Sequence, residues 1–140
     1  MSTADDAVRL FEEAGEHDSA GREAEAAVLY EQAMALGLDA ARSDQLVIQY
    51  ASTLRNLDRA DEAVELLQAL PADSSVGTAR AAFLALALRD AGRPDEALRI
   101  AIEALLPTLP RYHRSVAAYA AELTDEADEG PARRSARARR

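Results

Sequence analysis

A short motif that returns every 34 residues constrains this chain more than any other feature of its sequence. RADEA stands at residues 59–63 and RPDEA at residues 93–97, which places Ala63 and Ala97 34 positions apart. A third copy, GREAEA, ends at Ala26, 37 positions before Ala63. A period of this length is typical of stacked helix-turn-helix units, each of which buries its apolar face against its neighbours. The spacing therefore predicts an array of three such units.

The composition favours helices and excludes several kinds of chemistry. Alanine, the best helix former, occurs 33 times in 140 residues, and aromatic residues make up only 4%, which disfavours a β-sandwich. The absence of cysteine excludes disulfides, cysteine-ligated metal sites and a thiol nucleophile. A chain of this length supports one core. Its stability must therefore come from helix packing.

Small and large residues recur at fixed positions of the period. This pattern resembles the tetratricopeptide repeat, with a large residue at position 4, Leu at 7, a small residue at 8, Tyr at 11, Ala at 20, an aromatic residue at 24 and Ala at 27. Setting Ala26, Ala63 and Ala97 at position 20 fixes every other position. The residues that fit this packing pattern are Leu10, Ala14, Ala26, Tyr30 and Ala33 in the first unit, Val47, Tyr50, Ala51, Leu54, Ala63 and Leu67 in the second, and Leu84, Ala85, Leu88, Ala97, Ala101 and Ala104 in the third.

The resemblance implies an all-α fold, a right-handed α-α superhelix over residues 1–124. Its units span about residues 7–37, 44–75 and 78–109, and a capping helix spans about 110–124. Local signals predict seven helices at about residues 4–17, 22–36, 41–56, 59–69, 76–91, 94–106 and 110–124. Glu13 and His17 stand where the pattern expects apolar residues, so we expect the first helix to be a partly exposed end of the array. Residues 125–140 are acidic and then Arg-rich without an apolar face, which predicts a disordered tail.

No set of residues in the sequence supports catalysis. His17 and His113 lie in different units, without the HxxxH spacing of a metal site or a serine-centred motif beside them. The carboxylate pairs at residues 12–13, 23 and 25, and 61–62 fall near helix starts or on outer faces, where the helix dipole and water account for them. A glycine-rich phosphate loop is absent from the sequence. We therefore expect a non-enzymatic protein without a cofactor or a metal.

The resemblance also implies a binding surface. In similar proteins the first helix of each unit lines a concave groove that binds peptides or partner helices, through positions 2, 5, 6, 9, 12 and 13. These positions hold Gln45, Ile48, Gln49, Ser52, Arg55 and Asn56 in the second unit, and Ala79, Ala82, Phe83, Leu86, Arg89 and Asp90 in the third. The residues that chaperone-binding members use to hold a terminal carboxylate do not occur at the matching positions. Capture of chaperone C-termini is therefore not supported.

Two kinds of groove ligand remain open. Arg55 and Arg89 share position 12 of successive units, which predicts a short basic line. With Arg80, Arg111, His113 and Arg114 nearby, this line is expected to bind an acidic or carboxylate ligand. The apolar groove residues, such as Phe83 and Leu86, instead admit a partner helix or self-association. The chain is also similar overall to short bacterial tetratricopeptide proteins, and this resemblance implies a homodimer. A third interpretation takes the polar residues as an ordinary solvated face.

Charge separates the body of the chain from its end. Residues 1–124 contain 21 acidic and 11 basic side chains, and an acidic body repels phosphate backbones. Residues 133–140 contain five arginines, which leaves an alternative in which the tail contacts nucleic acid or another acidic surface. The N-terminal residues do not read as a signal peptide, and no apolar stretch reaches 18 residues. We therefore expect a cytoplasmic protein.

Overall fold

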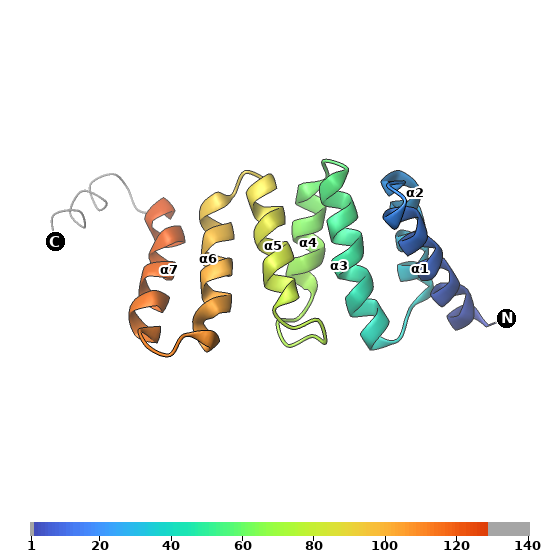
Figure 1. Ribbon diagram of the computed structural model, residues 1–140. Coiled ribbons are helices and arrows are strands. Elements are labelled where there is room, and N and C mark those ends of the chain that lie inside the picture. Colours follow the sequence, from blue (N-terminus) through green and yellow to red (C-terminus); the bar gives the residue numbers. More distant parts are fainter. Residues whose placement is uncertain (1, 129–140) are drawn as a thin grey trace.

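The computed structural model describes residues 2–128, which form seven α-helices and one short 3-10 helix (Figure 1). The helices are α1 (Thr3–Ser19), α2 (Glu23–Leu36), α3 (Ala40–Asn56), α4 (Ala60–Ala69), α5 (Ala79–Asp90), α6 (Pro94–Leu105), η1 (Leu106–Thr108) and α7 (His113–Asp128). The described residues contain no strand. The all-α prediction is therefore confirmed.

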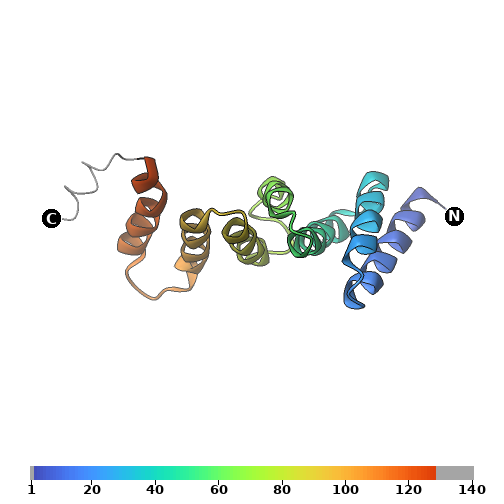
Figure 2. The same cartoon turned by 90° about the horizontal axis from the view of Figure 1, so that it is seen from above.

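The helices stand side by side in an elongated array that runs from α1 to α7 (Figures 1 and 2). α1 and α2, α3 and α4, and α5 and α6 form antiparallel pairs, and α3 also packs against α1 and α5. α7 packs against α6. No second helix follows α7 within residues 2–128, so its outer face, with Tyr119 67% exposed, is uncovered.

The turns inside the three helix pairs share one backbone geometry. A residue with positive φ follows the first helix of each pair: Gly21 (78°), Asp58 (60°) and Gly92 (79°). The next residue is an arginine whose backbone N–H donates to the carbonyl five residues earlier, over 2.8 or 2.9 Å. These donors are Arg22, Arg59 and Arg93. The left-handed residue and the long-range hydrogen bond together form a Schellman helix end, so one turn chemistry is used three times.

The core follows the repeat pattern. Of the 17 predicted packing residues, 12 are buried and the other five are half-buried. The half-buried ones are Leu10, Val47, Ala85, Ala101 and Ala104. Buried residues that the pattern does not include are Ala7, Ala27, Leu46, Thr53, Val64, Leu70, Ala87 and Ala120. Some of these also recur in register, because Ala27 and Val64 each directly follow a pattern alanine.

Helix boundaries differ from the predicted ones by up to four residues, most of all at α5, which begins at Ala79 rather than at about 76, and at α7. α6 ends at Leu105 because Pro107 has no N–H to continue the helical ladder, and η1 takes its place. α7 begins at His113, after Tyr112 with a φ of 72°, and it extends to Asp128, four residues beyond the predicted end at 124. The remainder of the predicted tail, residues 129–140, lies outside the described residues.

The C-terminus of α4 has a partner that the sequence did not indicate. Arg80, on α5, donates from Nε to the carbonyl oxygens of Leu67 (2.9 Å) and Leu70 (2.5 Å). Carbonyls at the C-terminal end of a helix lack partners inside the helix, and a positive charge there also interacts favourably with the negative end of the helix dipole. Arg80 therefore joins the second unit to the third, although the sequence placed it only near the groove.

Introducing a carboxylate at the pattern alanine of the second unit should disrupt the array. Ala63 is fully buried, and an unpaired buried charge is costly, so Ala63→Glu should lower the free energy of unfolding by roughly 3 kcal/mol or more. The control is Ala82→Glu at an exposed position of α5, with an expected change within about 0.5 kcal/mol. Urea denaturation followed by circular dichroism measures both. Equal stability of the two variants would show that the register is wrong.

Asp58 is the one non-glycine residue at the left-handed positions of the three Schellman turns, and replacing it with glycine should stabilise the protein. A left-handed conformation is strained for a residue with a Cβ, so Asp58→Gly should raise the free energy of unfolding by about 0.5–1 kcal/mol. Gly92→Ala, at the equivalent turn, should lower it by about 1 kcal/mol. Thermal melts of both variants test the turn geometry, which a destabilising Asp58→Gly change would contradict.

Candidate functional site

The first helices of the units form one face of the array. α3 packs against both α1 and α5, whereas no comparable contact joins α2 to α4 or α4 to α6 among the described residues. The first helices of neighbouring units therefore contact one another directly and the second helices do not, as on the concave side of a helical solenoid. We call the surface formed by α1, α3 and α5 the groove face.

The predicted groove residues differ in exposure. Gln45, Asn56, Leu86, Arg89, Arg111, His113 and Arg114 are exposed, while Ile48, Gln49, Ser52, Arg55 and Phe83 are half-buried. Ile48 and Phe83 also pack against the core, whereas Leu86 is 45% exposed. The α5 end of the groove face therefore offers an apolar side chain to a partner.

The predicted basic line is largely compensated inside the protein. Arg55 forms an ion pair with Asp90, and Arg89 Nη1 lies 3.1 Å from the other oxygen of the same carboxylate. Hydrogen bonds from Arg89 and Arg55 hold the pKa of Asp90 below its usual value. The sequence interpretation took the two arginines as available charges, but Asp90 already occupies the space between them.

The other predicted basic residues lie elsewhere. Arg111, His113 and Arg114 stand at or just before the start of α7, and Arg55 and Arg89 stand near the ends of α3 and α5. Because α3, α5 and α7 run in the same direction, the start of α7 is at the opposite edge of the array from those ends (Figure 1). The structure therefore does not bring the five side chains together.

A cavity of about 850 Å³ opens on the groove face between α1 and α3. Its lining residues are Glu12, Gly15, Glu16, Asp18, Ser19, Tyr30 and Gln49. In the repeat register, Glu12, Gly15, Asp18 and Ser19 occupy groove positions 6, 9, 12 and 13 of the first unit. The sequence analysis did not select them because it took the first helix as a terminal cap, although the register itself points to them. We call this the acidic cavity.

A polar network forms the inner wall of the acidic cavity. Asp18 Oδ2 accepts hydrogen bonds from the hydroxyls of Tyr30 (3.1 Å) and Thr53 (2.9 Å), and the Tyr30 hydroxyl also lies 3.1 Å from Gln49 Oε1. Tyr30 and Thr53 are fully buried. Burial and the Asp18 carboxylate raise the pKa of Tyr30 well above its usual value. The network joins α1, α2 and α3.

Aromatic contacts support the network from the core side. The ring of Tyr30 lies between those of Phe11 and Tyr50, with centroid distances of 6.3 Å and 6.0 Å. Tilted pairs at this separation are favourable beyond the apolar area that they bury. The wall of the acidic cavity is therefore held in place by both packing and hydrogen bonds.

Gly15 lies within α1 on the floor of the acidic cavity. A Cβ added at this position would meet no atom within 4 Å, so the packing does not require glycine here. Glycine inside a helix is less stable than alanine by about 1 kcal/mol. The glycine therefore leaves the cavity deeper at the expense of helix stability.

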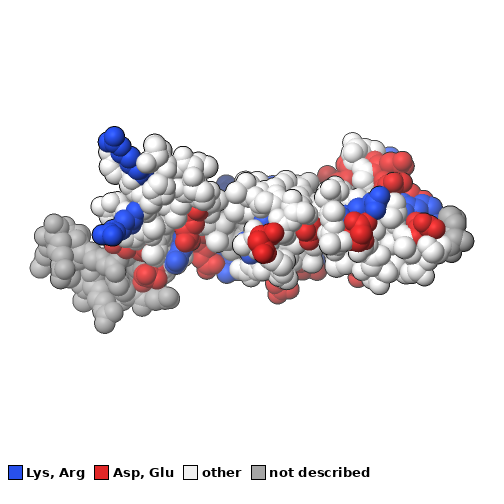
Figure 3. All heavy atoms as spheres, turned by 90° about the horizontal axis from the view of Figure 1, so that it is seen from below, with Lys and Arg blue, Asp and Glu red and all other residues white. Residues whose placement is uncertain are grey.

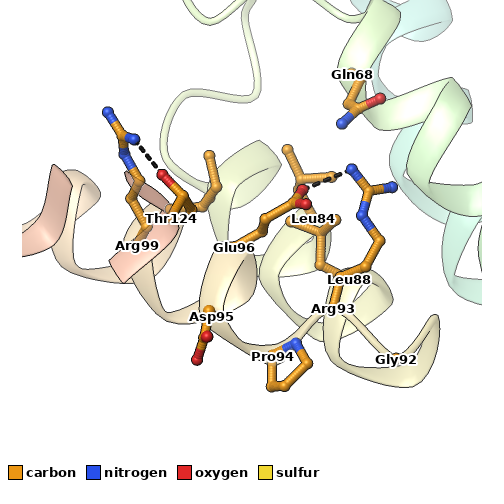
Figure 4. A pocket seen from close by; sticks show the side chains of 11 residues that line it. Gln68, Leu84, Leu88, Gly92, Arg93, Pro94, Asp95, Glu96, Arg99 and Thr124 are labelled. Carbon is orange, nitrogen blue, oxygen red and sulfur yellow. Dashed lines mark hydrogen bonds and ion pairs between the residues drawn. The ribbon is translucent and has the colours of Figure 1, made fainter. Parts of the chain in front are cut away.

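A second cavity, of about 530 Å³, opens among α4, α5, α6 and the end of α7 (Figure 4). Leu84, Leu88 and Ile100 give it apolar walls. Its arginines are engaged, because Arg93 pairs with Glu96 at 2.5 Å, and Arg99 pairs with Glu103 and contacts Thr124. This cavity therefore offers apolar surface to a ligand, whereas both of its arginines are already paired within the protein.

Residues 2–128 contain neither a candidate membrane-spanning helix nor a candidate metal-binding cluster. None of the helices there has the length and the apolar character needed to cross a membrane. The same part of the chain contains no group of three or more His, Cys, Asp or Glu side chains arranged to hold a metal ion.

The stacked helix pairs and their shared turn define a helical repeat solenoid. The chain belongs to the tetratricopeptide repeat family, because a model of that family, described as "Tetratrico peptide repeat", matches residues 7–123. The match confirms the resemblance seen in the sequence. Comparisons with curated proteins and with solved structures gave no match.

The buried Tyr30 hydroxyl should make stability depend on alkaline pH. An unfolded tyrosine loses its proton near pH 10, whereas folded Tyr30 retains its proton, so stability is complete below about pH 10 and decreases above it, by about 1.4 kcal/mol per pH unit for one group. Burial also raises the pKa of Tyr50. Urea denaturation of Tyr30→Phe should show a slope that is shallower by that amount.

The same variant should be less stable at neutral pH. Removing the hydroxyl deprives Asp18 of a donor, which should cost about 1–2 kcal/mol. Tyr119→Phe, at an exposed tyrosine, is the control and should change neither value. An unchanged alkaline slope in Tyr30→Phe would contradict the assignment of the buried proton.

Proposed function

We propose that this protein is a non-enzymatic interaction module that binds a peptide, a helix or a second subunit on its groove face. Tetratricopeptide repeats generally act as protein-interaction modules, and this family membership supports the proposal. The observation that carries it is the coincidence, on one face, of the acidic cavity and the exposed apolar side chain of Leu86. Such a face suits a segment with both apolar and charged side chains.

The charges of the groove face favour a different ligand from the one that the sequence suggested. An acidic ligand would have to compete with Asp90 for Arg55 and Arg89. At the other end of the face, Glu12, Glu16 and Asp18 line the cavity. We therefore propose a partner segment that places an apolar residue near Leu86 and basic residues near α1.

Peptide selection with matched leucine variants would test this function. Peptides selected from a displayed random library against the full chain should bind Leu86→Ala at least about tenfold more weakly, which corresponds to about 1.4 kcal/mol. Leu98 is a matched control because it is 49% exposed on α6, a second helix. Leu98→Ala should therefore leave the affinity unchanged.

The two substitutions also separate the possible outcomes. Both remove the same side chain from a comparably exposed helix position, so thermal melts should give similar stabilities. Peptides that bind Leu86→Ala as tightly as the wild type but lose affinity for Leu98→Ala would place the binding surface on the second helices. That result would overturn the proposed function.

A further inference from the structure

Charge is distributed unevenly along the array. Residues 2–39, which form α1, α2 and the following turn, contain ten acidic and two basic side chains, a net charge of −8. Residues 79–140 contain nine acidic and 11 basic side chains, a net charge of +2. Figure 3 shows acidic side chains gathered at the α1–α2 end and basic side chains projecting at the α7 end. The positive balance of residues 79–140 comes from the five arginines at residues 133–140, and these are complementary in charge to the acidic α1–α2 end.

The carboxylates of the acidic cavity are not neutralised by neighbouring residues. Glu12 and Glu16, one helical turn apart on α1, form no ion pair with any other described residue. Among the described residues, the carboxylate of Asp18 accepts hydrogen bonds from two hydroxyl groups and from no cationic side chain. By contrast, Glu13 on the same helix pairs with Arg9 at 3.1 Å. The cavity therefore presents negative charge to whatever enters it.

The shape of the cavity agrees with its charge. Gly15 lies between Glu12 and Glu16 in the sequence, and its missing side chain leaves open space that a helix-stabilising residue could fill. A long side chain with a charged end, such as arginine, suits a recess with carboxylates at its rim. The guanidinium group donates several hydrogen bonds in a planar fork that matches carboxylate oxygens.

The chain contains a segment of this chemistry beyond the described residues. Residues 133–140 read RRSARARR, with five arginines, no acidic residue and otherwise only serine and alanine. This segment follows α7, and α7 and α1 are at opposite ends of the array (Figure 1). A contact within one chain would require the segment to run along most of the array, whereas a contact between two copies has no such requirement.

We propose that the acidic cavity of one copy binds the arginine-rich segment, residues 133–140, of a second copy. Because cavity and segment belong to opposite ends of the array, each contact joins the first end of one copy to the last end of another, either head to tail or in an antiparallel two-fold pair in which each segment enters the other copy's cavity. The proposal rests on the proposed function of the groove face, and it specifies the partner for the acidic, α1 end of that face. It predicts self-association that weakens as salt rises, since ion pairs at an exposed rim are screened.

Sedimentation velocity of the full chain tests this association. The wild type should form larger species as concentration rises at low salt and should dissociate at high salt. Glu12→Gln with Glu16→Gln should weaken association at least about tenfold through the loss of charge-assisted contacts. The control, Glu23→Gln with Glu25→Gln, removes the same charge from α2 of the same unit and should leave association nearly unchanged. An equal effect of both pairs would overturn the proposal.

A mixing experiment determines the polarity of the contact. The cavity variant with an intact segment, and a segment variant in which Arg133, Arg134 and Arg137 become Gln, should each be monomeric alone. Mixed in equal amounts, they should form one-to-one pairs and nothing larger, because each pair has one usable cavity and one usable segment. Absence of these pairs would overturn the proposal, and so would a wild type that stays monomeric at every concentration.

Gly15 provides a test that loss of folding cannot mimic. Gly15→Leu fills the cavity floor with a good helix former, so it should raise the melting temperature and yet weaken self-association at least about tenfold. Ala24→Leu at an exposed position of α2 is the control and should not change association. Unchanged association in Gly15→Leu would overturn the proposal. The Leu86 and Leu98 variants test the groove face separately, so the two proposals can fail independently.

Discussion

The close approach of paired helices at small side chains is the constraint on which the rest of this structure depends. Ala26, Ala63 and Ala97 occupy the same register position in three successive pairs, and all three are buried. Only a small side chain lets two backbones approach this closely, and the larger residues of the period then fill the space between units. Because the constraint repeats every unit, one local contact sets the geometry of the whole array, including the line of first helices that forms the groove face.

The junction between the first two units combines this packing with polar specificity. Asp18, Tyr30 and Thr53 come from three different helices and meet inside the structure. A buried polar group is stable only when its partners are in place, so the network permits one arrangement of these helices. The same carboxylate that fixes the junction also lies at the acidic cavity, so the geometry of the candidate site is tied to that of the core.

Much of the fold could be predicted because its determinants are periodic, whereas the site depends on particular pairs of side chains. The alanine register gave the helices and the packing residues, and the shortened α6 is explained by Pro107 alone. Arg55 and Arg89 were taken as an available basic line because a repeat pattern compares equivalent positions and does not indicate that Asp90, from the adjacent position, pairs with both. The acidic cavity was missed for a related reason. Glu13 and His17 depart from the packing pattern, so α1 was taken as a terminal cap, and its groove positions, which do follow the register, were not considered.

The outer face of α7, which no other described residue covers, differs in sequence from the packed faces of the preceding units. Counting 34 residues onward from Leu84, Ala85 and Leu88, which pack α5 into its unit, leads to Ala118, Tyr119 and Glu122. These positions of α7 thus hold a small, an amphipathic and a charged side chain, whereas the packing of a further helix would require apolar side chains. The face can therefore remain exposed to water. Whether a further helix could pack on α7 therefore depends on a few side chains rather than on its backbone.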